Sequence, residues 1–112
     1  MSPARLFKFR VLPGQEAAYA AYLRGVVTPI DEAAHRDDVF AKLVTLTPDG
    51  EAAWNHGRVF VFRDLAQRDA FAARIAAHAA AFDGSAAATA RRKAQAETLR
   101  RLIGVSDYTL ED

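Results

Sequence analysis

Residues 58–63 restrict the fold more than any other segment, because four consecutive apolar residues stand there between two arginines. In a strand, alternate side chains point to opposite faces. Val59 and Val61 therefore share one face. Phe60 and Phe62 share the other. A strand that is apolar on both faces needs cover on both, so we expect a sheet that is packed on each side.

The other periodicities give a single order of elements along the 112 residues. Alternation of apolar and polar residues predicts four strands, at 5–12, 39–46, 58–63 and 105–110. Apolar residues at steps of three and four predict three helices, at 15–35, 64–83 and 85–104. Pro29 cannot donate a backbone hydrogen bond, so we expect the first helix to kink near Gly25 or to break into two pieces.

The two later helices have recognisable ends. Asp64, with Gln67 three residues further on, resembles a capping box, and Ser85 can cap the next helix. Gly84 and Gly104 are expected to end these helices, since glycine adopts the left-handed conformation at little cost. These boundaries leave the last strand short.

The resulting order is strand, helix, strand, strand, helix with an added helix, strand. This is the split β-α-β or ferredoxin-like plan, an α+β fold with a four-stranded antiparallel sheet and helices on one face. Residues 1–112 are expected to form a single domain, because the chain is too short for two. The helices cover only one face of the sheet, so the same face of a second copy is the simplest cover for the other. We therefore expect a homodimer joined through its open sheet face.

The composition argues against several classes of function. Without cysteine the chain has no disulfide and no thiolate metal site, which suits a reducing cytoplasm. A net charge of +1 is small for a nucleic-acid-binding surface. No apolar run has the length that a signal peptide or a membrane span requires. We expect a cytoplasmic protein that binds neither nucleic acid nor membrane.

RNA-recognition domains share this order of elements, and residues 58–62 are similar to their third-strand signature. That signature needs Gly or Ala between its aromatic residues so that bases can lie on the sheet. Val59 and Val61 occupy those positions here. The sequence therefore disfavours RNA binding.

Two junctions between a strand and a helix resemble the dimeric α+β barrel superfamily, and within it the antibiotic-biosynthesis-monooxygenase-like domains. The first, residues 7–16, passes through a Pro-Gly pair into a long helix, and the second joins residues 59–65 to Ala70 and Phe71. The resemblance implies a homodimer with a pocket between each sheet and its helices. Enzymes of this group oxygenate phenolic or quinone-like substrates without a cofactor, or degrade haem, and many relatives have no known activity.

Histidines are the candidates for acid-base chemistry, since they titrate near neutral pH. His78 lies within the apolar stripe of the second helix, where it either packs with a satisfied hydrogen bond or faces a pocket, and we predict it as the catalytic base. His35 is expected to form a pair at a helix end, and His56 to have a local role in a turn or bulge. We expect no metal site and no redox cofactor.

Four further residues are predicted to bind substrate. Tyr19 and Tyr22 lie on the inward face of the first helix, where each adds a hydroxyl to apolar area; core packing is the alternative. Arg92 falls towards the apolar side of the third helix, where it either reaches solvent or anchors an anionic or carbonyl group. Trp54 follows a turn and has three alternatives: to cap a barrel end, fill the dimer interface or stack on a planar ligand.

The sequence thus predicts a dimeric protein that binds a small aromatic molecule, with cofactor-independent oxygenation of a phenolic or quinone-like substrate as its reaction. In that reaction His78 would take a hydroxyl proton while Tyr22 and Arg92 orient the substrate. The alternative is a non-catalytic dimeric binding or structural module of the same fold. The sequence leaves open the substrate, the presence of catalysis, and whether His35 or His56 lines a pocket instead.

Overall fold

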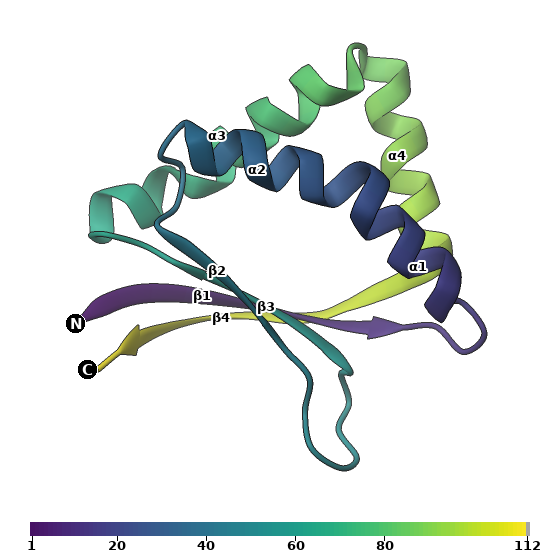
Figure 1. Cartoon of the computed structure of the whole chain (residues 1–112), viewed down its shortest axis with the longest axis horizontal. Coiled ribbons are helices and arrows are strands. Elements are labelled where there is room, and N and C mark those ends of the chain that lie inside the picture. Colours follow the sequence, from purple (N-terminus) through teal and green to yellow (C-terminus); the bar gives the residue numbers. More distant parts are fainter. Residues whose placement is uncertain (112) are drawn as a thin grey trace.

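The computed structural model describes residues 1–111 as a four-stranded sheet with the helices on one side of it (Figure 1). In chain order the elements are β1 Ser2–Val11, α1 Glu16–Tyr22, the π-helical turn η1 Leu23–Val27, α2 Thr28–Arg36, β2 Lys42–Leu46, β3 His56–Val61, α3 Leu65–Asp83, α4 Ala86–Leu99 and β4 Arg100–Leu110. In Figure 1, α3 and α4 meet at an apex that points away from the sheet. None of the helices in the described chain is both long and apolar enough to cross a bilayer.

The strands are arranged in the order β2-β3-β1-β4, and every neighbouring pair is antiparallel. In the central pair, Arg5 of β1 lies opposite Phe60 of β3. On its other side β1 pairs along its whole length with β4, with one irregularity between Lys8 and Phe9. The predicted α+β, ferredoxin-like arrangement with helices on one face is confirmed.

The predicted kink of the first helix takes the form of a π-helical turn. From α1 through η1 into α2 the chain stays helical, and the N–H of Thr28 donates to the carbonyl of Leu23, five residues back. Pro29 follows, and in a regular α-helix its ring would meet the carbonyl of Gly25. The wider turn is a common way to accommodate such a clash.

The boundary between α4 and β4 differs from the prediction. α4 ends at Leu99 rather than at Gly104, and β4 begins at once with Arg100, so the last strand is much longer than the predicted 105–110. Apolar residues after position 99 have helical spacing, but β1 is long enough to pair with β4 as far as Arg100, which lies opposite Val11. Here tertiary pairing overrides local helix preference.

β2 is shorter than predicted, because the chain turns into the core before the strand begins. Val39 and Phe40 were predicted as strand residues, yet they precede β2 and are buried. They pack beneath the helices with Phe60, Phe62 and Phe71. Val39 and Phe40 are therefore apolar because they pack in the core, and not because they belong to a strand.

Three predicted helix ends are confirmed. The carboxylate of Asp64 accepts a hydrogen bond from the N–H of Gln67 at the start of α3, at 2.8 Å. The hydroxyl oxygen of Ser85 accepts one from the N–H of Ala88 at the start of α4, at 3.1 Å. Gly84 ends α3 in the left-handed conformation, with φ of 84°. The conformation of Gly84 and the cap by Ser85 fix the turn at the apex between α3 and α4, whereas Asp64 fixes the start of α3.

The two faces of the sheet are packed differently, as residues 58–63 suggested. Phe60 and Phe62 are buried under the helices, whereas Val59 and Val61 are half-buried on the other side. We call this other side the open sheet face; by strand register it carries Leu6, Val44, Leu46, Val59 and Val61. The Trp54 indole also lies there, because a Cβ added to Gly57 would stand 2.8 Å from it.

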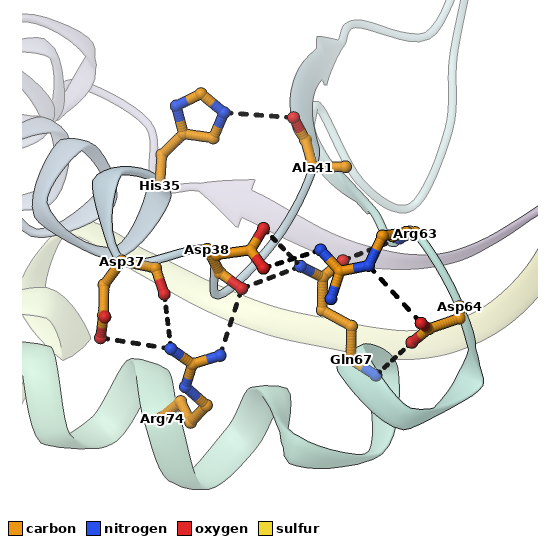
Figure 2. A network of polar contacts seen from close by, with 8 residues as sticks. All are labelled: His35, Asp37, Asp38, Ala41, Arg63, Asp64, Gln67 and Arg74. Carbon is orange, nitrogen blue, oxygen red and sulfur yellow. Dashed lines mark hydrogen bonds and ion pairs between the residues drawn. The ribbon is translucent and has the colours of Figure 1, made fainter.

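A polar network holds the connection between α2 and β2 against α3 (Figure 2). Gln67 is 5% exposed, and its side chain accepts from the N–H of Arg63 at 2.7 Å and donates to the carbonyl of Asp38 at 2.8 Å. Arg63 also pairs with the Asp38 carboxylate at 2.7 Å, and Arg74 reaches the carbonyls of Asp37 and Asp38. These bonds satisfy a turn in which Asp38 has a positive φ of 57°.

Candidate functional site

The core under the helices consists of two separate apolar clusters. The first gathers the buried phenylalanines of β3 and α3 with Ala34, Val39 and Phe40. The second lies at the other end of the sheet, where Tyr19, Tyr22, Val27 and Leu99 pack together. A core of this size ordinarily forms one contiguous cluster. The division indicates that something other than apolar packing occupies the middle.

Between the sheet and the helices lies a cavity of about 280 Å³, which we call the sheet–helix cavity. Its walls come from every layer of the molecule, and its lining residues are Tyr22, Val27, Ile30, Asp31, Arg58, Ile75, Ala76, Ala79, Thr89, Arg92, Lys93 and Arg100. A neighbouring hollow shares Tyr22, Arg92, Lys93 and Arg100 with it and extends to Leu102 on β4. The cavity therefore continues towards the β4 edge of the sheet.

A buried ion pair joins the sheet to α2 within this cavity. Arg58, on β3, donates to the carboxylate of Asp31, and their side chains are only 11% and 14% exposed. Burial raises the pKa of Asp31, which the charge of Arg58 opposes. Burial also lowers the pKa of Arg58. Both pKa values shift against the charged forms, as expected where desolvation outweighs the attraction between partners.

Arg100, the first residue of β4, is held among aromatic rings. Its guanidinium carbon lies 4.0 Å from the centroid of the Phe9 ring, and within 6 Å of the rings of Tyr19 and Tyr22. One of its nitrogens donates to the hydroxyl of Tyr19 at 2.9 Å. Within residues 1–111, no carboxylate forms an ion pair with it. Arg100 is thus a positioned cation that retains free N–H groups.

Arg92 forms the wall of the cavity near the apex of α3 and α4. Its Nε donates to the carboxylate of Asp83 at 2.9 Å, and that carboxylate is 3% exposed. The hydroxyl of Thr89 donates to the same carboxylate at 2.7 Å. Arg92 therefore both fixes the apex and faces the cavity.

The sheet–helix cavity is strongly positive. Its lining contains four cationic side chains and a single carboxylate, that of Asp31, which Arg58 already neutralises. Asp83 neutralises Arg92 from behind the wall. Two cations, Arg100 and Lys93, have no ion-pair partner in the described part of the chain. A concave site with apolar walls and unpaired cations suits an anionic ligand.

The structure brings together three of the predicted binding residues. Tyr22 and Arg92 line the sheet–helix cavity, and Tyr19 adjoins it through its hydrogen bond to Arg100. Trp54 is not with them, because it lies on the open sheet face. Their role in binding a substrate stays a prediction.

The three histidines are spread over the molecule. The Nε2–H of His78 donates to the carboxylate of Asp37 at 2.8 Å, near the far end of α2. His78 is absent from the lining of the sheet–helix cavity, and its role as a base stays a prediction. His35 contacts the carbonyl of Ala41 at 3.1 Å rather than a helix-end carboxylate.

His56 differs most from the expected turn position. It is the first residue of β3, and its ring lies edge-on to Tyr19 with 5.3 Å between centroids. Its Nε2 is buried and has no hydrogen-bond partner in the described residues. Burial lowers the pKa of His56, and the charges of Arg58 and Arg100 add to the effect. His56 is therefore held in its neutral form beside two arginines.

Of the lining residues only Tyr22 and Arg92 were predicted, and the charged residues Asp31, Arg58, Lys93 and Arg100 were missed. Arg58 is two residues before Phe60 on the same strand, so the two side chains point to the same face of the sheet. This alternation could have placed Arg58 under the helices. Arg100 could not have been found, since the sequence placed it on the polar face of a helix. Nothing in the sequence identifies Asp31 as a cavity residue except its position next to Ile30, which is buried.

The topology and the covered cavity together define an α+β protein of the ferredoxin-like fold. Among solved structures the chain is similar to HapK from Hahella chejuensis, with a TM-score of 0.58 and 13% identity over 97% of this chain and 92% of that one. It is also similar to a dimeric protein of unknown function with a ferredoxin-like fold from Bacteroides fragilis, with a TM-score of 0.53 and 11% identity over 97% and 96%. At these identities the similarity shows the fold alone. No protein-family model and no curated protein matches the sequence.

Proposed function

We propose that this chain is one half of a homodimer that binds a small aromatic molecule in the sheet–helix cavity. The observation that carries the proposal is the cluster of cations around apolar walls, with Arg100 left without an ion-pair partner among residues 1–111. A cavity serving only the fold would be filled more cheaply by apolar side chains, since buried charges cost free energy. Its volume of about 280 Å³ lies just below the roughly 300–1,000 Å³ of small-molecule sites, which suits a small planar ligand of up to three fused rings.

Dimerisation through the open sheet face is the second part of the proposal. By strand register that face carries the apolar residues Leu6, Val44, Leu46, Val59 and Val61 beside Trp54, with Lys8 and Lys42 at its ends. Apolar patches of this kind mark sites of protein association. The similar protein from Bacteroides fragilis is described as dimeric, which supports the same assembly here.

Cofactor-independent oxygenation of a phenolic substrate is the specific reaction that we propose, in agreement with the resemblance to the antibiotic-biosynthesis-monooxygenase-like domains. A methylene group of an anthrone-type substrate is oxidised to a carbonyl; one oxygen atom of dioxygen enters the product and the other leaves as water with the two hydrogens. The protein would remove the hydroxyl proton, and Tyr22 and Arg92 would stabilise the resulting oxyanion.

Two residues are candidates for the base in this reaction. His78 is the residue predicted from the sequence, but it does not line the sheet–helix cavity. Asp31 is the one carboxylate among the lining residues, and burial raises its pKa, which makes it a stronger base than an exposed carboxylate. We therefore favour Asp31.

Oxygen consumption tests the reaction and the base together. Protein treated with a chelator, without flavin or nicotinamide, should consume oxygen with an anthrone faster than the protein-free solution. His78→Ala should retain the activity, and Asp31→Asn, confirmed as folded by circular dichroism, should lose it. The reverse pattern would assign the base to His78.

A bulky residue in the cavity provides the matched control for binding. Ala79→Trp fills the sheet–helix cavity and should abolish binding and oxygen uptake, while Ala73→Trp on the exposed side of α3 should not. If the substrate binds but oxygen uptake equals the protein-free rate, the non-catalytic binding module is the correct description. If Ala79→Trp binds as well as the unaltered protein, the cavity is not the site.

A further inference from the structure

We infer that the ligand of the sheet–helix cavity carries a carboxylate, and that Arg100 binds it. This inference rests on the proposed function, because it names the chemistry of a ligand in the same cavity. It follows from the one guanidinium among the lining residues that is positioned but unpaired in the described chain.

The surroundings of Arg100 fix its orientation before any ligand arrives. The Phe9 ring covers one side of the guanidinium, with 4.0 Å between the guanidinium carbon and the ring centroid, and the Tyr19 hydroxyl accepts from one nitrogen at 2.9 Å. A guanidinium presents five N–H donors, so several stay free in its plane. A fork of planar donors matches the two oxygens of a carboxylate. Such pre-positioning also lowers the entropy lost on binding.

The other charges of the cavity leave Arg100 as the available anchor. Arg58 is already paired with Asp31, and Arg92 with Asp83. Lys93 is exposed at the rim that the cavity shares with its neighbouring hollow, where it adds attraction for an anion. The positive field therefore converges on Arg100 and Lys93.

A phosphate is a poorer match than a carboxylate. Phosphate sites commonly use free backbone N–H groups at the start of a helix. The lining residues of α3 begin at Ile75 and those of α4 at Thr89, beyond the first turn of either helix. The N–H of Thr89 is already bonded to the carbonyl of Ser85. Side chains alone provide the donors here.

The walls define the rest of the ligand. Ile75, Ala76 and Ala79 of α3 line the cavity together with Val27 and Ile30, so much of its wall is apolar. Apolar walls of this kind suit an aromatic ring. The structure thus assigns an aromatic acid of one or two rings to the cavity.

Binding of three matched naphthalenes tests this inference in the unaltered protein. Naphthoate carries the carboxylate, naphthamide has nearly the same shape without the charge, and naphthol has only the hydroxyl. Titration calorimetry should give an affinity for naphthoate about tenfold or more above that for naphthamide. Higher salt should reduce this preference, because the recognition is electrostatic.

Variants of two arginines test which residue causes the preference for naphthoate over naphthamide. Arg100→Gln should bring the naphthoate and naphthamide affinities to within about twofold of each other, while Arg91→Gln, an equal loss of charge on the exposed side of α4, should preserve the difference. If Arg100→Gln does not fold, Arg100→Lys decides, because it retains the charge but loses the planar fork and should weaken naphthoate binding alone.

The outcomes separate this inference from the proposed function. If naphthamide or naphthol binds as tightly as naphthoate, and Ala79→Trp abolishes that binding, the carboxylate inference is wrong and the cavity remains a binding site. If the naphthoate preference persists in Arg100→Gln, Arg100 is not the anchor and the inference is overturned. If none of the three binds, the proposed function and the inference both fail.

Discussion

The buried ion pair of Arg58 and Asp31 is the residue-scale feature that sets this interior apart. Removing two charges from water costs several kcal/mol each, which their attraction offsets only in part. The pair lies between the two apolar clusters and lines the sheet–helix cavity. The pair therefore contributes little net stability to the fold, and its main effect is to place two charged groups in the wall of the cavity.

Removing one partner of this pair should cost more than removing both. Asp31→Asn leaves the Arg58 guanidinium buried without an opposite charge, and should lower the free energy of unfolding by about 3–5 kcal/mol. The double variant Asp31→Leu with Arg58→Met should be more stable than this single variant, because no unpaired charge remains. Urea unfolding followed by circular dichroism measures both. A double variant that is less stable than Asp31→Asn would contradict the explanation.

His56 should make the stability of the protein depend on pH. Its pKa is lowered in the folded state, chiefly by burial, from an unfolded value near 6.5. The unfolded chain therefore binds the proton more readily, so stability is fully present above about pH 6.5 and is lost as pH falls through the lower, folded pKa. Melting temperatures between about pH 8 and about pH 5 should fall for the unaltered protein and fall less for His56→Gln. Equal slopes for the two proteins would show that His56 is not responsible.

At the scale of elements, the turn between α3 and α4 sets how these two helices lie over the cavity. Gly84 has a φ of 84°, and no atom would contact an added Cβ, so only its backbone conformation resists substitution. Gly84→Ala should therefore lower the free energy of unfolding by about 1–2 kcal/mol. Gly25→Ala, in η1, meets no atom either and has no positive φ, so it should be neutral or stabilising. Thermal melts that show the same effect for both substitutions would be inconsistent with strain at Gly84.

The same scale shows what the sequence could predict. The caps at Asp64 and Ser85 and the kink before Pro29 depend on local bonds, and local patterns identified them. The start of β4 at Arg100 depends on pairing with β1, which lies about ninety positions earlier in the chain, so no local pattern could reveal it. Tyr22 and Arg92 could be predicted as cavity residues because each lies on the inward side of a helix.

At the scale of the whole molecule, the sheet is covered by helices on one side and bare on the other (Figure 1). The open sheet face is apolar near β3, where Val59 and Val61 lie. A second copy of the chain would bury it through the same face on each partner. The proposed homodimer would thus provide the second cover that the apolar residues of 58–63 require.

A charge on this face should therefore separate the subunits. Val59→Asp, whose cross-strand neighbours are Leu6 and Val44, would place an unpaired carboxylate in the interface at a cost of several kcal/mol, and the protein should become monomeric at micromolar concentration. Leu65→Asp is the control, since Leu65 is 57% exposed at the start of α3, away from the sheet face, and should leave the dimer intact. Sedimentation equilibrium gives the masses directly. An unaltered protein of 12.2 kDa in solution would contradict the proposed assembly.

A ligand bound between the sheet and the helices should change the environment of the residues that line the cavity. Backbone amide shifts measured by NMR during titration with naphthoate detect this change residue by residue. The largest changes should be at Arg58, Ile75, Ala79 and Arg100, which lie on three different elements around the cavity. Changes confined to the open sheet face near Trp54, or no saturable change at all, would contradict it.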